Sequence, residues 1–147
     1  MTPLHHAGLC PADFDLSLRF YRDGVGLDVL ADFTMDADLE RLLGRHTEAV
    51  RAVFLGSATS RDAGTLELLD LGGEGFAGQP AGPGTPARGV FLLSFQTPVD
   101  DALNRLAALG LGGAPRVMRG PQDAITATVV DPDGVTVELL NNPMTQL

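Results

Sequence analysis

The sequence has no tryptophan, few other aromatic residues and a single cysteine, Cys10. Aromatic platforms that stack on nucleic-acid bases are therefore not expected. One cysteine forms no internal disulfide, which favours a reducing compartment, and without a Cys-x-x-Cys motif or a Cys/His cluster no structural zinc site is expected. Acidic residues outnumber basic residues, and the resulting net charge of −9 argues against a nucleic-acid partner.

Long apolar runs are also missing. No stretch reaches the roughly 18 apolar residues of a membrane span, and the N-terminus has no basic region followed by an apolar one. We therefore expect neither a membrane span nor a signal peptide, and we predict a cytoplasmic protein. The 147 residues, 44% of them hydrophobic, can bury one substantial core or form two half-size modules that share one.

Two short stretches each place one glutamate at the centre of an apolar strand pattern. Residues 64–71 carry Glu67, residues 134–140 carry Glu138, and Leu-Leu follows in both cases. A carboxylate in a buried strand costs several kcal/mol, or becomes protonated, unless it binds something. Two such carboxylates, about half a chain length apart, suggest a shared cation.

Strand and helix patterns follow the same order on either side of a Gly/Pro-rich segment, residues 72–89. That composition supports neither helix nor strand and predicts a linker. The expected elements before it are a strand at 4–10, a helix at 13–24, strands at 27–33, 48–55 and 64–71, and a short acidic helix at 35–43. After it we expect a strand at 90–95, a helix at 99–109, and strands at 115–118, 125–130 and 134–140. The order predicts an α+β fold of two βαβββ modules, residues 1–71 and 90–147.

Two stretches resemble the opening and closing signatures of vicinal oxygen chelate proteins. They are His6-Ala7-Gly8-Leu9 through Asp13, Ser17 and Phe20-Tyr21 to Gly26-Leu27, and Asp131-Pro132-Asp133-Gly134 followed by Val137-Glu138-Leu139. This superfamily includes glyoxalase I, methylmalonyl-CoA epimerase, extradiol dioxygenases, fosfomycin-resistance thiol transferases and bleomycin-binding proteins. The resemblance covers nearly the whole chain and implies one glyoxalase-like domain, whose two modules form a curved mixed sheet around a cleft. It is specific for the fold and not for the reaction, because this fold hosts several chemistries.

The resemblance also implies one divalent ion in the cleft, held by the first and last strand of each module. The matching positions are His6, Glu67 and Glu138, whereas the fourth position holds Leu92. One imidazole and two carboxylates suit Zn, Mn, Co, Ni or Fe(II) with open positions for water or substrate. They do not match the 2-His-1-carboxylate triad, which disfavours extradiol ring cleavage.

Strand alternation places Leu92, Ser94 and Gln96 on one face, so Ser94 and Gln96 are the polar candidates for substrate binding beside Leu92. Arg51 lies on a strand expected to face the cleft, where it would either bind an anionic substrate or form a salt bridge at the edge.

The first strand gives three further expectations. Alternation predicts that His5 and His6 point to opposite faces. Cys10 is interpreted as a small buried residue, because no cationic neighbour or helix N-terminus is evident beside it. His46, in a loop, is a further candidate to reach the site.

Two functions remain open. The first is a metal-dependent isomerase or lyase, in which the ion binds two neighbouring oxygens of a small metabolite and stabilises an enediolate or other oxyanion. Glu67 or Glu138 would then be the general base. The second is a metal-independent protein of the bleomycin-resistance type that sequesters a bulky small molecule, which the apolar Leu92 favours. The resemblance further implies a homodimer.

Overall fold

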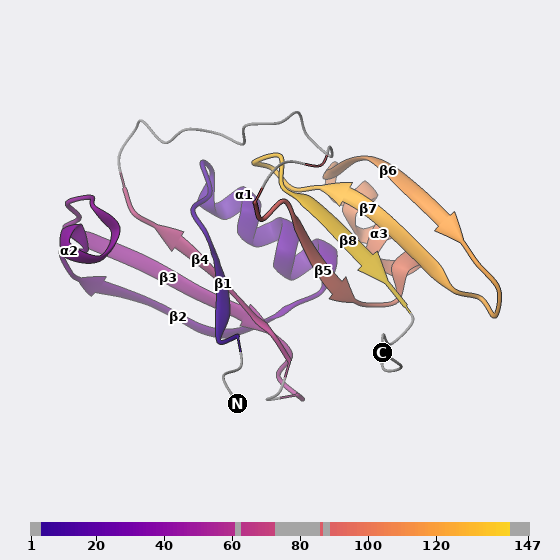
Figure 1. Cartoon of the computed structure of the whole chain (residues 1–147), viewed down its shortest axis with the longest axis horizontal. Coiled ribbons are helices and arrows are strands. Elements are labelled where there is room, and N and C mark those ends of the chain that lie inside the picture. The colour runs from indigo at the N-terminus through magenta and orange to yellow at the C-terminus, as the bar shows by residue number, and fades with distance from the viewer. Residues whose placement is uncertain (1–3, 61–62, 73–85, 87–88, 142–147) are drawn as a thin grey trace. The chain divides into compact units, whose positions relative to one another are not determined.

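The computed structural model describes residues 4–60, 63–72, 86 and 89–141 (Figure 1). Most of the predicted linker, residues 72–89, lies outside the described residues. The elements in chain order are β1 (His6–Leu9), α1 (Phe14–Leu18), η1 (Arg19–Val25), β2 (Asp28–Asp36), α2 (Glu40–Leu43), β3 (Ala49–Gly56), β4 (Thr65–Asp70), β5 (Leu92–Gln96), α3 (Val99–Leu109), β6 (Gly112–Arg119), β7 (Ile125–Val130) and β8 (Thr136–Leu140).

The strands form two four-stranded sheets, in the orders β1-β4-β3-β2 and β5-β8-β7-β6. In each sheet the first pair is parallel and the other two pairs are antiparallel. Both sheets are therefore mixed and repeat one topology. The predicted α+β class with two βαβββ modules is confirmed.

The chain forms two compact units. In the described part of the chain, unit 1 contains residues 4–14 and 27–72, and unit 2 contains residues 15–26, 86 and 89–141. Unit 1 thus holds the sheet β1-β4-β3-β2, whereas unit 2 holds the sheet β5-β8-β7-β6, the helix α3 and η1. The units follow the sequence modules except for the helical segment 15–26.

Sheet pairing extends β2 beyond the end predicted for it at residue 33. Residues 35–43 are predicted to be a short helix, but only Glu40–Leu43 is helical, and Met35 and Asp36 continue β2. The reason is that Met35 pairs with Val50 and Asp36 with Ala49 on the neighbouring strand. Local composition does not report such a partner. None of the helices among the described residues has the length and apolar character of a membrane span.

Unit 2 has its core between its sheet and its helices. In α3, Val99, Ala102 and Leu106 recur at helical spacing and are buried. Arg105, on the same helix, donates from Nε to the carbonyl of Gly24 at 3.0 Å and from Nη2 to that of Val25 at 3.1 Å. These bonds satisfy carbonyls at the end of η1, which would otherwise lack a helical partner.

The close packing of η1 on α3 at Gly24 predicts a stability effect. A Cβ at Gly24 would lie 2.3 Å from Cδ2 and 3.1 Å from Cγ of the buried Leu106. Gly24→Ala is therefore expected to lower the free energy of unfolding by about 1–3 kcal/mol, because overpacking displaces a fixed side chain. The measurement is urea denaturation followed by circular dichroism. Gly64→Ala is the matched control, since nothing lies within 4 Å of its Cβ position; equal losses in both variants would contradict this explanation.

Candidate functional site

In unit 1, the structure brings His6 and Glu67 together. Nε2 of His6 lies 3.1 Å from Oε2 of Glu67, and the two side chains are 36% and 12% exposed. They come from the parallel neighbours β1 and β4, where Gly8 is the register partner of Glu67 and His6 that of Thr65. Residues two apart on a strand share a face, so the imidazole and the carboxylate lie on the same side of the sheet.

The missing side chain at Gly8 keeps the flank of this pair open. A Cβ at Gly8 would lie 3.9 Å from Oε2 of Glu67. Any larger side chain at this position would occupy the space directly across the strand pair from the carboxylate. On the β1 side, the carboxylate is therefore flanked by the His6 imidazole and by Gly8, which has no side chain.

The ring of His5 contacts the ring of His6. Their Nδ1 atoms are 2.7 Å apart and their centroids 5.0 Å. The prediction that the two rings point to opposite faces is therefore wrong, because β1 begins at His6 and His5 lies outside the regular alternation. A hydrogen bond between the Nδ1 atoms leaves Nε2 of His6 directed at Glu67.

Cys10 is exposed, which corrects its interpretation as a buried residue.

Two phenyl rings lie beside the imidazole of His6 on the same face of the unit 1 sheet. The centroids of His6 and Phe54 are 5.6 Å apart with nearly perpendicular rings, and those of Phe54 and Phe33 are 6.1 Å apart with an interplanar angle of 16°. Phe54 is the register partner of Glu67. Imidazole, carboxylate and two stacked phenyl rings thus share one face.

In unit 2, Ser94 and Glu138 occupy the corresponding place. The hydroxyl of Ser94 donates to Oε2 of Glu138 at 2.7 Å, and the two residues are register partners on β5 and β8. Leu92 pairs with Thr136 as His6 pairs with Thr65. The register therefore places Leu92 at the position equivalent to His6, and Ser94 at the position equivalent to Gly8.

The same face of the unit 2 sheet also carries Arg116, a positively charged residue that the sequence analysis did not single out. Glu138 pairs with Thr128 on β7, and Thr128 pairs with Arg116 on β6, so one polar row crosses the sheet. Gln96 lies two residues beyond Ser94 on β5 and shares this face by alternation. The alternating pattern of β7 was visible in the sequence, but the β6–β7 register, with its irregularity between Gly112 and Arg116, was not.

Most of the chain matches the model of a known family. The model of the Glyoxalase/Bleomycin resistance protein/Dioxygenase superfamily matches residues 3–139. The chain belongs to this superfamily. Its resemblance to the vicinal oxygen chelate proteins is therefore confirmed at the level of family and fold.

Individual members give the same result. The chain is 34% identical, over 95% of its length and 75% of the other protein's, to the lactoylglutathione lyase-like protein terB of Aspergillus terreus. A glyoxalase family protein from Bacillus cereus superposes with a TM-score of 0.70 at 12% identity, covering 95% of this chain and 93% of the other. The fosfomycin resistance protein FosX of Listeria monocytogenes, in complex with Mn(II) and 1S,2S-dihydroxypropylphosphonic acid, superposes with a TM-score of 0.58 at 16% identity, covering 99% and 97%.

A glyoxalase superfamily member commonly holds a divalent ion, and the His6–Glu67 pair has the chemistry for one. An imidazole nitrogen and a carboxylate oxygen are ligands that Zn, Mn, Co, Ni and Fe(II) accept. They converge at 3.1 Å, and the contact of His5 with Nδ1 of His6 is the outer-shell partner that ligating histidines usually have. Gly8 has no side chain that would fill the space beside Oε2 of Glu67. The residues present therefore fit the ion.

Arg51 lies on the other face of the unit 1 sheet. It pairs with Asp70 in register, three positions from the Phe54–Glu67 pair, and alternation places it opposite Glu67. Its guanidinium donates to both carboxylate oxygens of Asp32 at 3.0 and 2.8 Å, and this bond holds the pKa of Asp32 below its ordinary value. The structure thus contains the salt bridge that the sequence offered as one alternative, and substrate binding by Arg51 stays a prediction.

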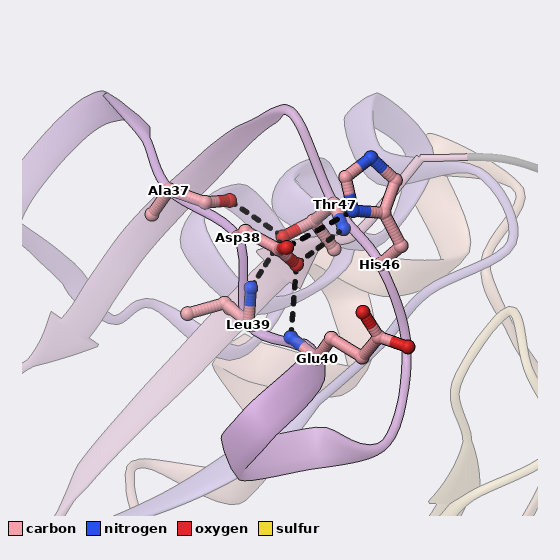
Figure 2. A network of polar contacts seen from close by, with 6 residues as sticks. All are labelled: Ala37, Asp38, Leu39, Glu40, His46 and Thr47. Carbon is pink, nitrogen blue, oxygen red and sulfur yellow. Dashed lines mark hydrogen bonds and ion pairs between the residues drawn. The ribbon is translucent and has the colours of Figure 1, made fainter.

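A second group of ligand-type side chains lies in the loop between β2 and β3 (Figure 2). Asp38, Glu40 and His46 place one ligand atom each within 4.8 Å of one another, and all three are exposed. Oδ1 of Asp38 accepts the backbone N–H of Glu40 at 3.0 Å and that of Thr47 at 3.3 Å, and Oδ2 lies 3.1 Å from Nδ1 of His46. These bonds lower the pKa of Asp38, with the Glu40 bond contributing most. Asp38 therefore closes the loop, and His46 serves as its partner there.

The closing signature of the superfamily has a structural role in unit 2. The buried Tyr21 hydroxyl donates to Oδ2 of Asp131 at 2.7 Å, and Oδ1 of Asp131 accepts the N–H groups of Asp133 at 2.9 Å and Val135 at 2.8 Å. Burial raises the pKa of Asp131, and the bond from Tyr21 opposes this rise. Burial and the neighbouring Asp131 also raise the pKa of Tyr21. This carboxylate joins the segment 15–26 to the turn before β8.

Proposed function

We propose that this chain is a metal-dependent enzyme of the glyoxalase-like type, an isomerase or lyase acting on a small oxygenated metabolite. The observation that carries the proposal is the convergence of His6 and Glu67 from neighbouring parallel strands, at 3.1 Å and beside a glycine. Membership of the superfamily supports it, since the resemblance implies a divalent ion held by residues at these two positions.

The chain's own residues have distinct roles in this proposal. His6 and Glu67 hold a divalent ion of the Zn, Mn, Co, Ni or Fe type, and His5 fixes the ring orientation of His6. When bound, the ion supplies positive charge that stabilises an oxyanion as it develops. Glu138 is the general base, because its carboxylate accepts a proton at Oε1 or Oε2 while the Ser94 hydroxyl orients it.

Polar side chains next to Glu138 would bind the substrate. Ser94 and Gln96 share its face, with Leu92 as an apolar neighbour, and Arg116 adds a positive charge to the same row. An alternative role of Glu138, as a third ligand to the ion, stays a prediction. The effect of Glu138→Gln separates the two roles: a ligand's loss weakens metal binding, whereas a base's loss lowers kcat alone.

Two of the similar proteins support the chemistry. The Aspergillus terreus relative is described as lactoylglutathione lyase-like, and the Listeria monocytogenes neighbour is described with Mn(II). Carrying lyase chemistry and a divalent ion to this chain is part of the proposal. A homodimer and a cytoplasmic location, both predicted from the sequence, complete it.

A second function is favoured by Leu92 and the two phenyl rings. Leu92 replaces a ligand-type residue at the position equivalent to His6, and Phe33 and Phe54 make a face that suits apolar ligands. These features favour a metal-independent protein that sequesters a small molecule. The two functions differ in whether the chain needs the ion.

Metal content tests the proposal directly. Plasma mass spectrometry of protein purified without an affinity tag, before and after chelation and reloading with Mn, Co, Ni, Zn or Fe, is expected to find about one tightly held ion per chain. Hydroxycarbonyl compounds would then be screened for turnover with the reloaded protein. If the protein retains no ion and binds none after reloading, the proposal of a metal-dependent enzyme is overturned and the sequestration function is favoured.

A further inference from the structure

We infer that the ligand of the proposed site carries a flat aromatic ring, which stacks on Phe33 and Phe54 while its oxygens face His6 and Glu67. This inference rests on the proposed function for the position of the oxygen-bearing end. It adds the substrate class, which neither the family nor the pair of ligands specifies.

The rings on this face already form a stack that is open at one end. Phe54 meets His6 edge to face at 5.6 Å and lies nearly parallel to Phe33 at 6.1 Å. Phe33 belongs to β2, the edge strand of the sheet, and is 42% exposed, a large fraction for a phenyl side chain. Aromatic rings pair at centroid distances of about 4.5–7 Å, so a ligand ring continues the same geometry.

The neighbours of the two rings are small. Phe33 pairs in register with Ala52, and Phe54 pairs with Ala31. In each cross-strand pair the phenyl ring therefore faces a methyl group, which cannot cover it. A bulkier partner at either position would shield the ring that the ligand is to contact.

Polar and apolar groups are separated along the face. The titratable side chains His6 and Glu67 come from β1 and β4, whereas β3 and β2 contribute Phe54 and Phe33. Neighbouring strands lie about 4.8 Å apart, so the phenyl rings begin one strand away from the carboxylate. A molecule with adjacent oxygens at one end and a ring at the other matches this order, and a polar sugar or a short aliphatic acid does not.

Two hydroxy acids with the same oxygen-bearing end test the ring. The probes are 3-phenyllactate and 3-cyclohexyllactate, and the measurement is isothermal titration calorimetry on the full chain, both loaded with Mn²⁺ and metal-free. We expect 3-phenyllactate to bind about fivefold more tightly than 3-cyclohexyllactate, because stacking adds to the area that both rings bury. Phe33→Leu is expected to abolish this preference, since a leucine keeps the apolar contact and removes the ring.

Val29→Ala is the matched control on the same strand. Val29 is 44% exposed and pairs with Leu55, on the other face from Phe54, so this variant is expected to keep the preference. Equal affinity for the two probes, no binding of 3-phenyllactate to either form of the protein, or an unchanged preference in Phe33→Leu would overturn the inference.

The metal-free titration separates this inference from the proposed function. If the chain holds none of Mn, Co, Ni, Zn or Fe but the metal-free protein still prefers the phenyl probe, the enzyme proposal fails and the aromatic site stands. If Mn²⁺ binds and the two probes bind equally, the metal site stands and the aromatic site fails.

Discussion

Glu67→Gln is expected to abolish tight binding of the divalent ion and to lower activity by about two to three orders of magnitude. In the wild type, Oε2 of Glu67 lies 3.1 Å from Nε2 of His6. The amide of glutamine has the size of the carboxylate but lacks its charge and its second acceptor oxygen. Metal content by plasma mass spectrometry and the Kd for Mn²⁺ by calorimetry measure the effect. Circular dichroism is expected to show an intact fold, because glutamine has nearly the same volume as glutamate and Gly8 leaves space beside the side chain.

Glu40→Gln is the control that decides where an ion binds. Glu40 belongs to the exposed loop group with Asp38 and His46, so its substitution removes the charge from the other candidate position. Retention of the ion in Glu67→Gln together with its loss in Glu40→Gln would move the metal to the loop. Loss in Glu67→Gln alone supports the pair in the sheet.

Asp131→Ala is expected to lower the free energy of unfolding of unit 2 by about 3–5 kcal/mol, because three donors, two of them in buried hydrogen bonds, lose the carboxylate that accepts them. These donors are the Tyr21 hydroxyl and the N–H groups of Asp133 and Val135. Urea denaturation measures the loss. Asp133→Ala is the control, since the carboxylate of Asp133 accepts a longer, part-buried bond of 3.3 Å from Ser17, and a smaller loss is expected. Equal losses would show that the turn, and not its buried acceptor, is what matters.

The same carboxylate predicts a pH dependence. Burial raises the pKa of Asp131 in the folded state above its ordinary value near 3.8. The folded state therefore holds this proton more tightly than the unfolded state, and the contribution of Asp131 to stability falls as the pH rises through the raised pKa. Asp131→Asn does not titrate, so the stability advantage of the wild type over this variant is expected to be largest at low pH and to shrink toward neutral pH. An advantage that grows with pH over the same range would contradict the raised pKa.

The local sequence predicted the elements well where one residue pattern decides them. The helix at 99–109 and the strand at 125–130 occur with the predicted bounds, because apolar residues at helical or alternating spacing leave one arrangement that buries them. The positions of Glu67 and Glu138 in their strands, and the equivalence of Leu92 with His6, also followed from the repeat and agree with the register.

Pairing between strands decided what the sequence could not. Arg51 and Glu67 are separated by the faces of the sheet, and only the β3–β4 register shows this. Arg116 joins the row of Glu138 through β7, and His5 meets His6 because β1 begins at His6, two residues later than the strand expected at 4–10.

The sequence by itself determined the two βαβββ modules and the types of side chain available for a site, since those follow from local periodicity and from the residues themselves; the family followed from the resemblance of its two signature stretches. The tertiary structure decided which side chains meet: imidazole with carboxylate beside Gly8, hydroxyl with carboxylate at Ser94, and two phenyl rings in line with them. The reason is that a strand fixes only the alternation of its own side chains, whereas neighbours across a sheet depend on hydrogen-bond register with segments far away in the chain.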